Sequence, residues 1–400
     1  MVDAISSALI IGALIIINGF AANFFFKKTG IPDMLFLIFI GVIFGPIFGI
    51  FDPITVKNFA PFIAALALAY ILFDGGMGLN IKHVLSNSPK AIILAIIGFV
   101  FSVIAVCGFM VFVFNVPLVY GLLFGSMLGG SSSIVVISLA SRIKLSDEGG
   151  AILIMESAIT DILCIVISLS LLDIIVTGQA NVLNVGLDIV GKLFIGLGIG
   201  LAIGFIWLFA LRKIARLPFS YMLTIGVILL GYAVSETLGG SGALSALVFG
   251  LILGNERDLL HLFRRYSYND ESLELAVSKG LRRFQREIAF LIRTFFFVFL
   301  GLIFSPTSFS LLLAGVVLSL ILLLTRFGAI WITTAKTSLK SERPIMAFIL
   351  TRGLAAAVLA TLPAQFNLPY SDLFVNIAVL IIVSTAIIAT VGTFVLARRQ

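Results

Sequence analysis

Residues 149–172 read GGAILIMESAITDILCIVISLSLL, an apolar run of 24 residues that carries two acids, Glu156 and Asp161. As a helix this run is about 36 Å long at about 1.5 Å per residue, which exceeds the roughly 30 Å of a bilayer's hydrocarbon core. The rest of the chain is similar, since 60% of its 400 residues are hydrophobic and 11% are charged, against roughly 25% charged in soluble domains. We therefore expect an all-α polytopic membrane protein. Runs of this length exclude a membrane β-barrel, whose strands alternate over about 10 residues.

Apolar runs of this kind predict thirteen transmembrane helices. We place them over residues 4–26, 32–50, 59–79, 91–114, 117–140, 149–172, 185–211, 218–237, 241–254, 288–304, 309–335, 344–362 and 373–397. The ninth is short for a span. The first is too long and too evenly apolar for the core of a cleavable signal, so we expect it to be a span as well.

The basic residues predict the orientation, because cytoplasmic loops of membrane proteins collect Lys and Arg. With the N-terminus outside and the C-terminus in the cytoplasm, 21 of the 26 basic residues fall in cytoplasmic segments. The largest such segment, a cytoplasmic loop at 255–287, is expected to be a solvated connector near anionic lipid headgroups; a regulatory or partner-binding role is the alternative. The net charge of +7 then reflects topology, and no nucleic-acid partner is expected.

Ionisable side chains inside spans are costly, so each one suggests a function or an ion pair. Counted from the cytoplasmic ends, Glu156, Arg326 and Arg352 lie about 12, 15 and 12 Å deep, whereas Asp161 lies about 18 Å deep, near the midplane. The matching depths favour a buried ion pair between Glu156 and an arginine. Such a pair could serve transport or could only stabilise the fold. For Asp161 we expect ion binding. Asp74, about 12 Å deep, lines an inner funnel or caps a helix contact.

Two spans contain sequences that weaken a helix. Residues 125–133 read GSMLGGSSS in the middle of the fifth span, and residues 351–353 read TRG in the twelfth. Interrupted helices at corresponding places in two halves of a chain indicate a transport site, although small residues also allow close helix packing. The two breaks are seven spans apart, so the spans run in opposite directions. This predicts one transmembrane domain over 1–400, with inverted six-helix repeats at 4–172 and 218–397 and a linker helix at 185–211.

The motifs together resemble those of a known family. They are FDGG at 73–76, SSS at 131–133, ESAITD at 156–161, FFFVFLG at 295–301 and TRG at 351–353. Over almost its whole length the chain resembles the monovalent cation/proton antiporter family, above all its NhaP-like sodium/proton exchanger branch. The resemblance implies a homodimer in which a core with crossed, discontinuous fifth and twelfth helices moves against a dimerisation scaffold.

The resemblance also assigns residues. Asp161 takes the place of the shared ion and proton carrier, and Glu156 takes that of the glutamate that pairs with an eleventh-helix arginine, here Arg326. Two positions depart from the branch: Ser132 stands where it has an aspartate, and Thr160 where it has an asparagine. The serine pair at the fifth-helix break is similar to that of the potassium-efflux branch.

These observations predict an antiporter of the cell membrane, and no enzyme. Asp161 would bind either a proton or one cation, Na⁺ first and Li⁺ too, with Thr160, Ser131, Ser132 and freed carbonyls as further oxygen ligands. Arg352 would tune the charge of the site. One carboxylate that exchanges one charge for another predicts electroneutral 1:1 exchange. An empty carboxylate would carry its charge through hydrocarbon at a high cost in free energy, so only the occupied site is expected to cross. No cofactor is expected. A K⁺/H⁺ antiporter or potassium-efflux transporter is the main alternative, followed by a passive cation channel and, least favoured, an intramembrane hydrolase.

Overall fold

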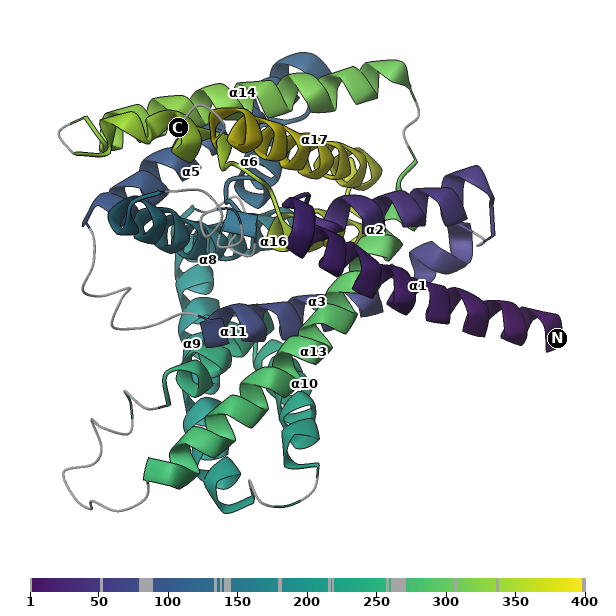
Figure 1. The fold of residues 1–400 in the computed structure, drawn as a ribbon, viewed down its shortest axis with the longest axis vertical. Helices are drawn as coiled ribbons and strands as arrows, with labels where there is room; N and C mark the ends of the chain where they lie inside the picture. The colour runs from purple at the N-terminus through teal and green to yellow at the C-terminus, as the bar shows by residue number, and fades with distance from the viewer. Residues whose placement is uncertain are drawn as a thin grey trace. The chain divides into compact units, whose positions relative to one another are not determined.

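The computed structural model describes residues 2–50, 53–78, 89–132, 135–136, 139, 145–178, 182–214, 217, 219–256, 259, 271–305, 308–335 and 338–397. Within these ranges every regular element is a helix (Figure 1). Ser133 and most of the connector between 257 and 270 lie outside the described residues. The chain forms two compact units, one of Met1–Ala64, Ser88–Val176 and Thr294–Gln400, the other of Ala65–Asn87 and Thr177–Arg293.

The first unit holds most of the helices. They are α1 (Val2–Thr29), α2 (Asp33–Val42), the π-helix η1 (Ile43–Ile47), α5 (Pro89–Phe114), α6 (Leu118–Met127), α8 (Asp147–Thr177), α14 (Phe309–Thr333), the 3₁₀ helix η2 (Ser338–Ser341), α15 (Arg343–Phe348), α16 (Leu354–Gln365) and α17 (Ser371–Ala397). The second unit holds α9 (Val182–Ile214), α10 (Ser220–Thr237) and α11 (Gly242–Gly254). Two helices, α3 (Pro53–Gly78) and α13 (Glu271–Ile303), contribute residues to both units.

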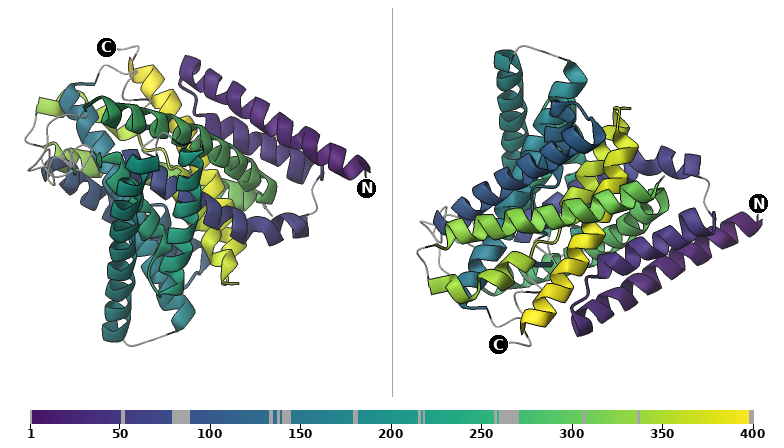
Figure 2. Two further views of the ribbon diagram at one scale, coloured as in Figure 1. Left: turned by 90° about the horizontal axis from the view of Figure 1, so that it is seen from below. Right: turned by 90° about the horizontal axis from the view of Figure 1, so that it is seen from above.

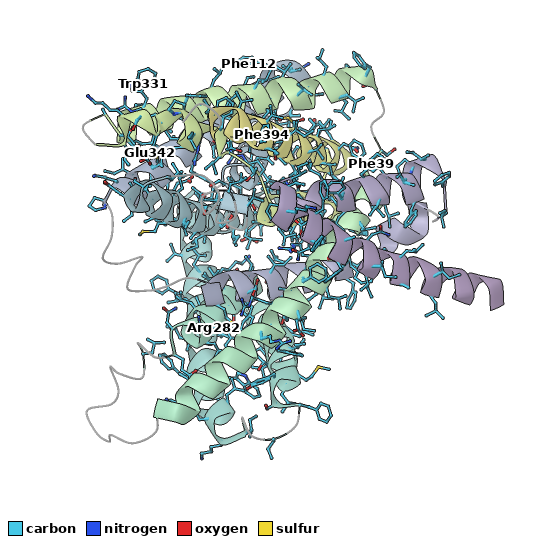
Figure 3. All side chains as sticks on the ribbon, viewed as in Figure 1. Phe39, Phe112, Arg282, Trp331, Glu342 and Phe394 are labelled. Carbon is cyan, nitrogen blue, oxygen red and sulfur yellow. The ribbon has the colours of Figure 1, made fainter. Side chains whose placement is uncertain are left out.

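Six described helices are long and apolar enough to cross a membrane. They cover Pro89–Phe114, Glu148–Thr177, Val190–Ile214, Ser220–Thr237, Phe309–Thr333 and Ser371–Leu396. The large apolar side chains labelled in Figure 3 include Phe112, Trp331 and Phe394, which are 85%, 64% and 56% exposed. Exposed apolar surface on this scale suits a protein whose solvent is lipid, because lipid tails do not penalise it. The chain is thus a multi-pass, all-helical membrane protein.

Close helix packing in the first unit depends on small residues. α5 packs on α6 and α14, and α17 packs on α14 and α16, while α1 and α2 lie side by side in both views of Figure 2. A Cβ on Gly41 or Gly301 would overlap the backbone of the opposite helix, so only glycine permits this approach of α2 to α13. Such packing, rather than a hydrophobic driving force, holds helices together in lipid.

The second unit explains why the ninth predicted span is short. Almost all of α11 is buried, and it packs against α9 and α10. Both of its ends are capped by side chains: Ser241 Oγ accepts a hydrogen bond from Leu244 N at 3.2 Å, and Arg282 Nη2 donates to Gly254 O at 2.5 Å. Because protein surrounds the helix and its ends are satisfied, it does not need the full length of a bilayer.

The helices differ from the predicted spans in three places. The fifth span, 117–140, is helical as α6 only to Met127, and the twelfth, 344–362, is divided into α15 and α16. The third difference lies in the expected cytoplasmic loop 255–287, because α13 begins at Glu271 and continues into the tenth span without interruption. Residues 271–287 contain many strong helix formers and no proline, so the helix extends beyond the apolar run.

Candidate functional site

The two interrupted spans meet in the first unit. α6 ends at Met127, and the backbone between α15 and α16 is not helical from Ile349 to Gly353. The two non-helical segments pair directly, since Ser132 N donates a hydrogen bond to Thr351 O at 2.7 Å. A side chain on Gly353 would overlap that of Ser132, so the segments are also in van der Waals contact. Backbone groups that a continuous helix would satisfy are therefore gathered at this crossing.

Glycines explain the break in the fifth span. Gly129 and Gly130 both weaken a helix, and both allow close contacts in the folded chain. A Cβ on Gly129 would lie 2.5 Å from a ring carbon of Phe99, and one on Gly130 would lie 2.8 Å from Cys164 Sγ. The local sequence thus favours unwinding, and the packing leaves no room for side chains at either position.

Arg352 binds the backbone just beyond the carboxyl end of α6. Its Nη1 donates to Gly129 O at 3.0 Å and also to Gly130 O, and its Nη2 donates to Ser102 Oγ on α5 at 3.0 Å. Both carbonyls lie in the non-helical segment after α6, and their hydrogen bonds to the guanidinium stabilise its buried charge. Arg352, which the TRG sequence places in the second break, thereby joins that segment to the end of the first.

Glu156 and Arg326 form a bidentate ion pair between α8 and α14. Arg326 Nη1 lies 2.7 Å from Glu156 Oε1, and Nη2 lies 2.9 Å from Oε2. Both side chains are buried, and Ser131 Oγ donates to the same carboxylate at 3.2 and 3.3 Å. A buried carboxylate with this many donors is neutralised in place. The pair that the similar depths suggested is therefore present, and a serine of the fifth-span break is attached to it.

Thr160 connects α8 to the same break. Ser131 N donates to Thr160 Oγ1 at 3.3 Å, and that hydroxyl in turn donates to Ser157 O at 3.1 Å. Along α8, four buried residues lie at intervals of four and so share one face of the helix: Glu156, Thr160, Cys164 and Ser168. Ser168 Oγ lies 2.8 Å from Ser126 Oγ. This face of α8 is therefore mostly polar over about three turns, and it meets both α6 and the segment after it.

Asp161 lies beside this polar face, one residue after Thr160. It is half-buried, whereas Glu156 is 1% exposed, and it is close enough to Cys164 for an electrostatic interaction. Of the two acids in the sixth span, Glu156 is thus fully enclosed by donors and Asp161 is the more accessible. Accessibility is what a group needs if it is to exchange its bound ion.

Asp74 does not join this group within the first unit. It lies on the part of α3 that belongs to the second unit, half-buried, with Arg293 and Arg286 of α13 as charged neighbours. The structure does show two hydroxyl residues that sequence reasoning missed, Ser102 beside Arg352 and Thr385, whose Oγ1 accepts a hydrogen bond from Arg352 N at 3.1 Å. A single serine or threonine in an apolar span has no distinctive pattern, so no signal was available.

The oxygen-rich crossing suits a hard cation. Carboxylate, hydroxyl and carbonyl oxygens gather there, and among the described residues no three His, Cys, Asp or Glu side chains cluster as they would around a transition metal. A helical membrane protein in which interrupted helices meet at a buried polar site has the architecture of a secondary transporter.

Comparison with known proteins places the chain more narrowly. Residues 10–399 match the family described as sodium/hydrogen exchanger, transmembrane. The chain belongs to this family. The K⁺/H⁺ antiporter NhaP2 of Shewanella sp. (strain ANA-3) is 28% identical over 400 residues, which cover 96% of this chain and 66% of the relative. The Na⁺/H⁺ antiporter ApNhaP of Aphanothece halophytica is 29% identical over 234 residues, which cover 58% and 43%.

The fold also matches a solved structure. The sodium proton antiporter MjNhaP1 of Methanocaldococcus jannaschii at pH 8 superimposes with a TM-score of 0.77 at 22% identity, over 99% of this chain and 97% of that one. At this identity the likeness establishes the fold. The chain spans slightly less than two thirds of the length of the NhaP2 relatives.

Proposed function

We propose that the protein exchanges a monovalent cation for a proton across the cell membrane, with Asp161 as the shared carrier. The family and the fold support antiport. The observation that carries the assignment is the hydrogen-bonded crossing of two non-helical segments against α8, one residue from Asp161. No prosthetic group takes part in the proposed cycle, whose only transported species are the cation and the proton.

The charges of the site divide into fixed and exchangeable groups. Glu156 and Arg326 neutralise each other, and Arg352 is held against the carboxyl end of α6. Asp161, the more accessible of the two acids in the sixth span, is the carboxylate that we assign to ion exchange. When it is occupied by a proton or a cation its charge is cancelled, and the core can cross between inward- and outward-facing states. When no ion is bound, the charge of the carboxylate opposes the crossing by several kcal/mol. One carboxylate predicts 1:1, electroneutral exchange.

Hydroxyls around Asp161 supply further ligands for the cation. Ser131 Oγ donates its proton to Glu156, and this hydrogen bond does not occupy the lone pairs with which the oxygen would bind a cation. Thr160 Oγ1 uses its proton on Ser157 O and accepts one bond from Ser131 N, which leaves a second lone pair. Ser132 stands at the crossing itself. Together with the Asp161 carboxylate these groups form an oxygen site for a hard cation.

Two cations are candidates. The ESAITD motif at 156–161 resembles that of sodium exchangers and favours Na⁺, with Li⁺ as a further substrate. The serine pair Ser131–Ser132 favours K⁺, as do relatives that are named K⁺/H⁺ antiporters and align with 96% of this chain. Proteoliposomes that contain a pH dye, challenged in turn with Na⁺, Li⁺ and K⁺ and with the voltage clamped by an ionophore, would give both selectivity and stoichiometry.

The wider architecture is also part of the proposal. Thirteen spans with an external N-terminus would account for the distribution of basic residues. We assign the break after α6 and the break between α15 and α16 to corresponding positions of two inverted repeats. We expect the protein to work as a homodimer, with its lipid-exposed surfaces in the cell membrane. A cysteine introduced at either terminus and labelled with a membrane-impermeant thiol reagent would show on which side of the membrane that terminus lies.

The carrier assignment is tested by Asp161→Asn, which preserves shape and removes the exchangeable charge. We expect no cation-driven proton flux from this variant in proteoliposomes. Asp173→Asn is the matched control, because it removes another carboxylate of α8 three turns further along and should retain exchange. Normal flux through Asp161→Asn would show that another group is the carrier.

A further inference from the structure

One end of α8 is held by a cluster that the transport site does not contain. Ser146, which precedes α8, donates its N–H to Glu342 Oε1 at 3.2 Å and its hydroxyl to Glu342 Oε2 at 3.1 Å. The same hydroxyl accepts a hydrogen bond from Gly149 N at 3.1 Å, so Ser146 caps the first turn of α8. Glu342 therefore holds the residue that fixes where α8 begins.

The neighbouring Arg343 holds the end of another helix. Its Nε donates to Thr334 Oγ1 at 2.8 Å and its Nη2 donates to Thr334 O at 2.6 Å. Thr334 follows α14 directly and is buried, and the guanidinium of Arg343 lies 5.6 Å from the ring centroid of Trp331. A cation that binds the final carbonyl of a helix is favourably placed in the helix dipole.

Gly149 gives independent support for this close fit. A Cβ at this position would overlap the carboxylate of Glu342, since Oε2 occupies that space. Gly149 does not have a left-handed backbone, so the need for glycine comes from the approach of Glu342 and not from a turn. Two neighbouring residues at the start of α15 thus join the beginning of α8 to the end of α14, and we name Ser146, Glu342, Arg343 and Thr334 the helix-end clamp.

The three joined helices are those that carry the candidate site. α8 bears Glu156 and Asp161, α14 bears Arg326, and α15 leads into Thr351 and Arg352. Helices are stiff along their axes, so the register of the three ends sets the heights at which these side chains meet. We propose that Glu342 and Arg343 are positioning residues, which act through α8 and α14 to hold the cation site in its binding geometry. This inference rests on the proposed antiport function.

The proposal is tested by removing the clamp and measuring the apparent KM for the cation separately from the maximal rate. Coupling between separate sites typically changes affinity by about 5- to 150-fold, and we expect about a five-fold rise in KM for Glu342→Ala and for Ser146→Ala. Ser146→Thr keeps the hydroxyl and should restore the original KM. Gly149→Ala should raise KM as well, because its methyl group displaces the Glu342 carboxylate without removing any charge.

Glu148→Gln is the matched control. Like Glu342→Ala, it removes a carboxylate near the start of α8, but Glu148 pairs with Lys90 at 2.7 Å and is 45% exposed, so this pair contributes little. Its KM should remain unchanged. An unchanged KM in Ser146→Ala, or an equal rise in KM in Glu148→Gln, would overturn the proposal. If Glu342→Ala fails to fold, the comparison of Ser146→Ala with Ser146→Thr still tests it. Wild type and Asp161→Asn are measured in parallel, so a wild type without exchange refutes the antiport function instead.

Discussion

Arg326 and Arg352 are both buried in the first unit, at 6% and 4% exposed, yet their charges are balanced differently. Arg326 faces a full negative charge in a two-point contact with Glu156. Arg352 faces neutral acceptors, namely the carbonyls of Gly129 and Gly130 and the hydroxyl of Ser102. One region is a side-chain ion pair between continuous helices, and the other is a side chain bound to the backbone of a broken one.

This contrast indicates different roles. The Glu156–Arg326 pair joins two side chains, and α8 and α14 remain regular helices around it. The pair is therefore a neutral group in a fixed position beside the carrier. Arg352 depends on the non-helical backbone after α6, because Gly129 O and Gly130 O become available only where the helix ends. We infer that Arg352 is coupled directly to the backbone conformation of the break, whereas the ion pair is coupled to helix packing and contacts the break through the Ser131 hydroxyl.

The largest effect is expected from breaking the ion pair on one side. Glu156→Ala or Arg326→Met leaves an uncompensated buried charge, and such changes typically cost about 3–5 kcal/mol of folding free energy. The double variant Glu156→Leu with Arg326→Met removes both charges and should recover much of that loss. Thermal unfolding in detergent measures all three. A Glu156→Ala protein that unfolds and transports like wild type would remove the ion pair from the mechanism.

A smaller effect is expected at Arg352. Arg352→Met leaves no buried charge behind, but Gly129 O, Gly130 O and Ser102 Oγ lose their donor, and hydrogen bonds to charged groups contribute about 1.5–3 kcal/mol each at most. We expect a loss of about 2–3 kcal/mol in unfolding free energy together with a marked loss of exchange. If the backbone-bound arginine mattered only for stability, a variant that is still folded would exchange at the normal rate.

A still smaller effect is expected where the two breaks touch. Gly353→Ala forces a methyl group against the Ser132 side chain, and overpacking of this kind typically costs about 1–3 kcal/mol. Ser132→Gly in the same chain removes that side chain and should restore part of the stability. A Gly353→Ala protein as stable as wild type would show that the crossing is looser than the Ser132 N to Thr351 O bond of 2.7 Å implies.

Part of this arrangement was predictable from sequence, for physical reasons that differ between residues. Similar depths were enough to pair Glu156 with Arg326, because a buried charge needs a partner at its own level. Glycines marked both breaks. The partners of Arg352 were not predictable, because two are backbone carbonyls and the third is a single serine in an apolar span. The extension of α13 back to Glu271 was missed because the charged residues of 271–287, although good helix formers, are also typical of a solvated connector.

The smallest effect is expected at Thr351, and Thr385, the second threonine next to Arg352, provides the comparison. Thr351 Oγ1 is buried without a hydrogen-bond partner among the described residues, whereas Thr385 Oγ1 accepts a bond from Arg352 N and donates to Ile381 O at 2.6 Å. Thr351→Val should therefore change the unfolding free energy by less than about 1 kcal/mol, while Thr385→Val leaves a buried N–H unpaired and should cost about 1–3 kcal/mol. Unfolding midpoints of the two variants, measured side by side, check the difference. A larger loss from Thr351→Val would mean that its hydroxyl binds water or the transported ion. If it binds the ion, the Arg352 region is part of the ion site itself.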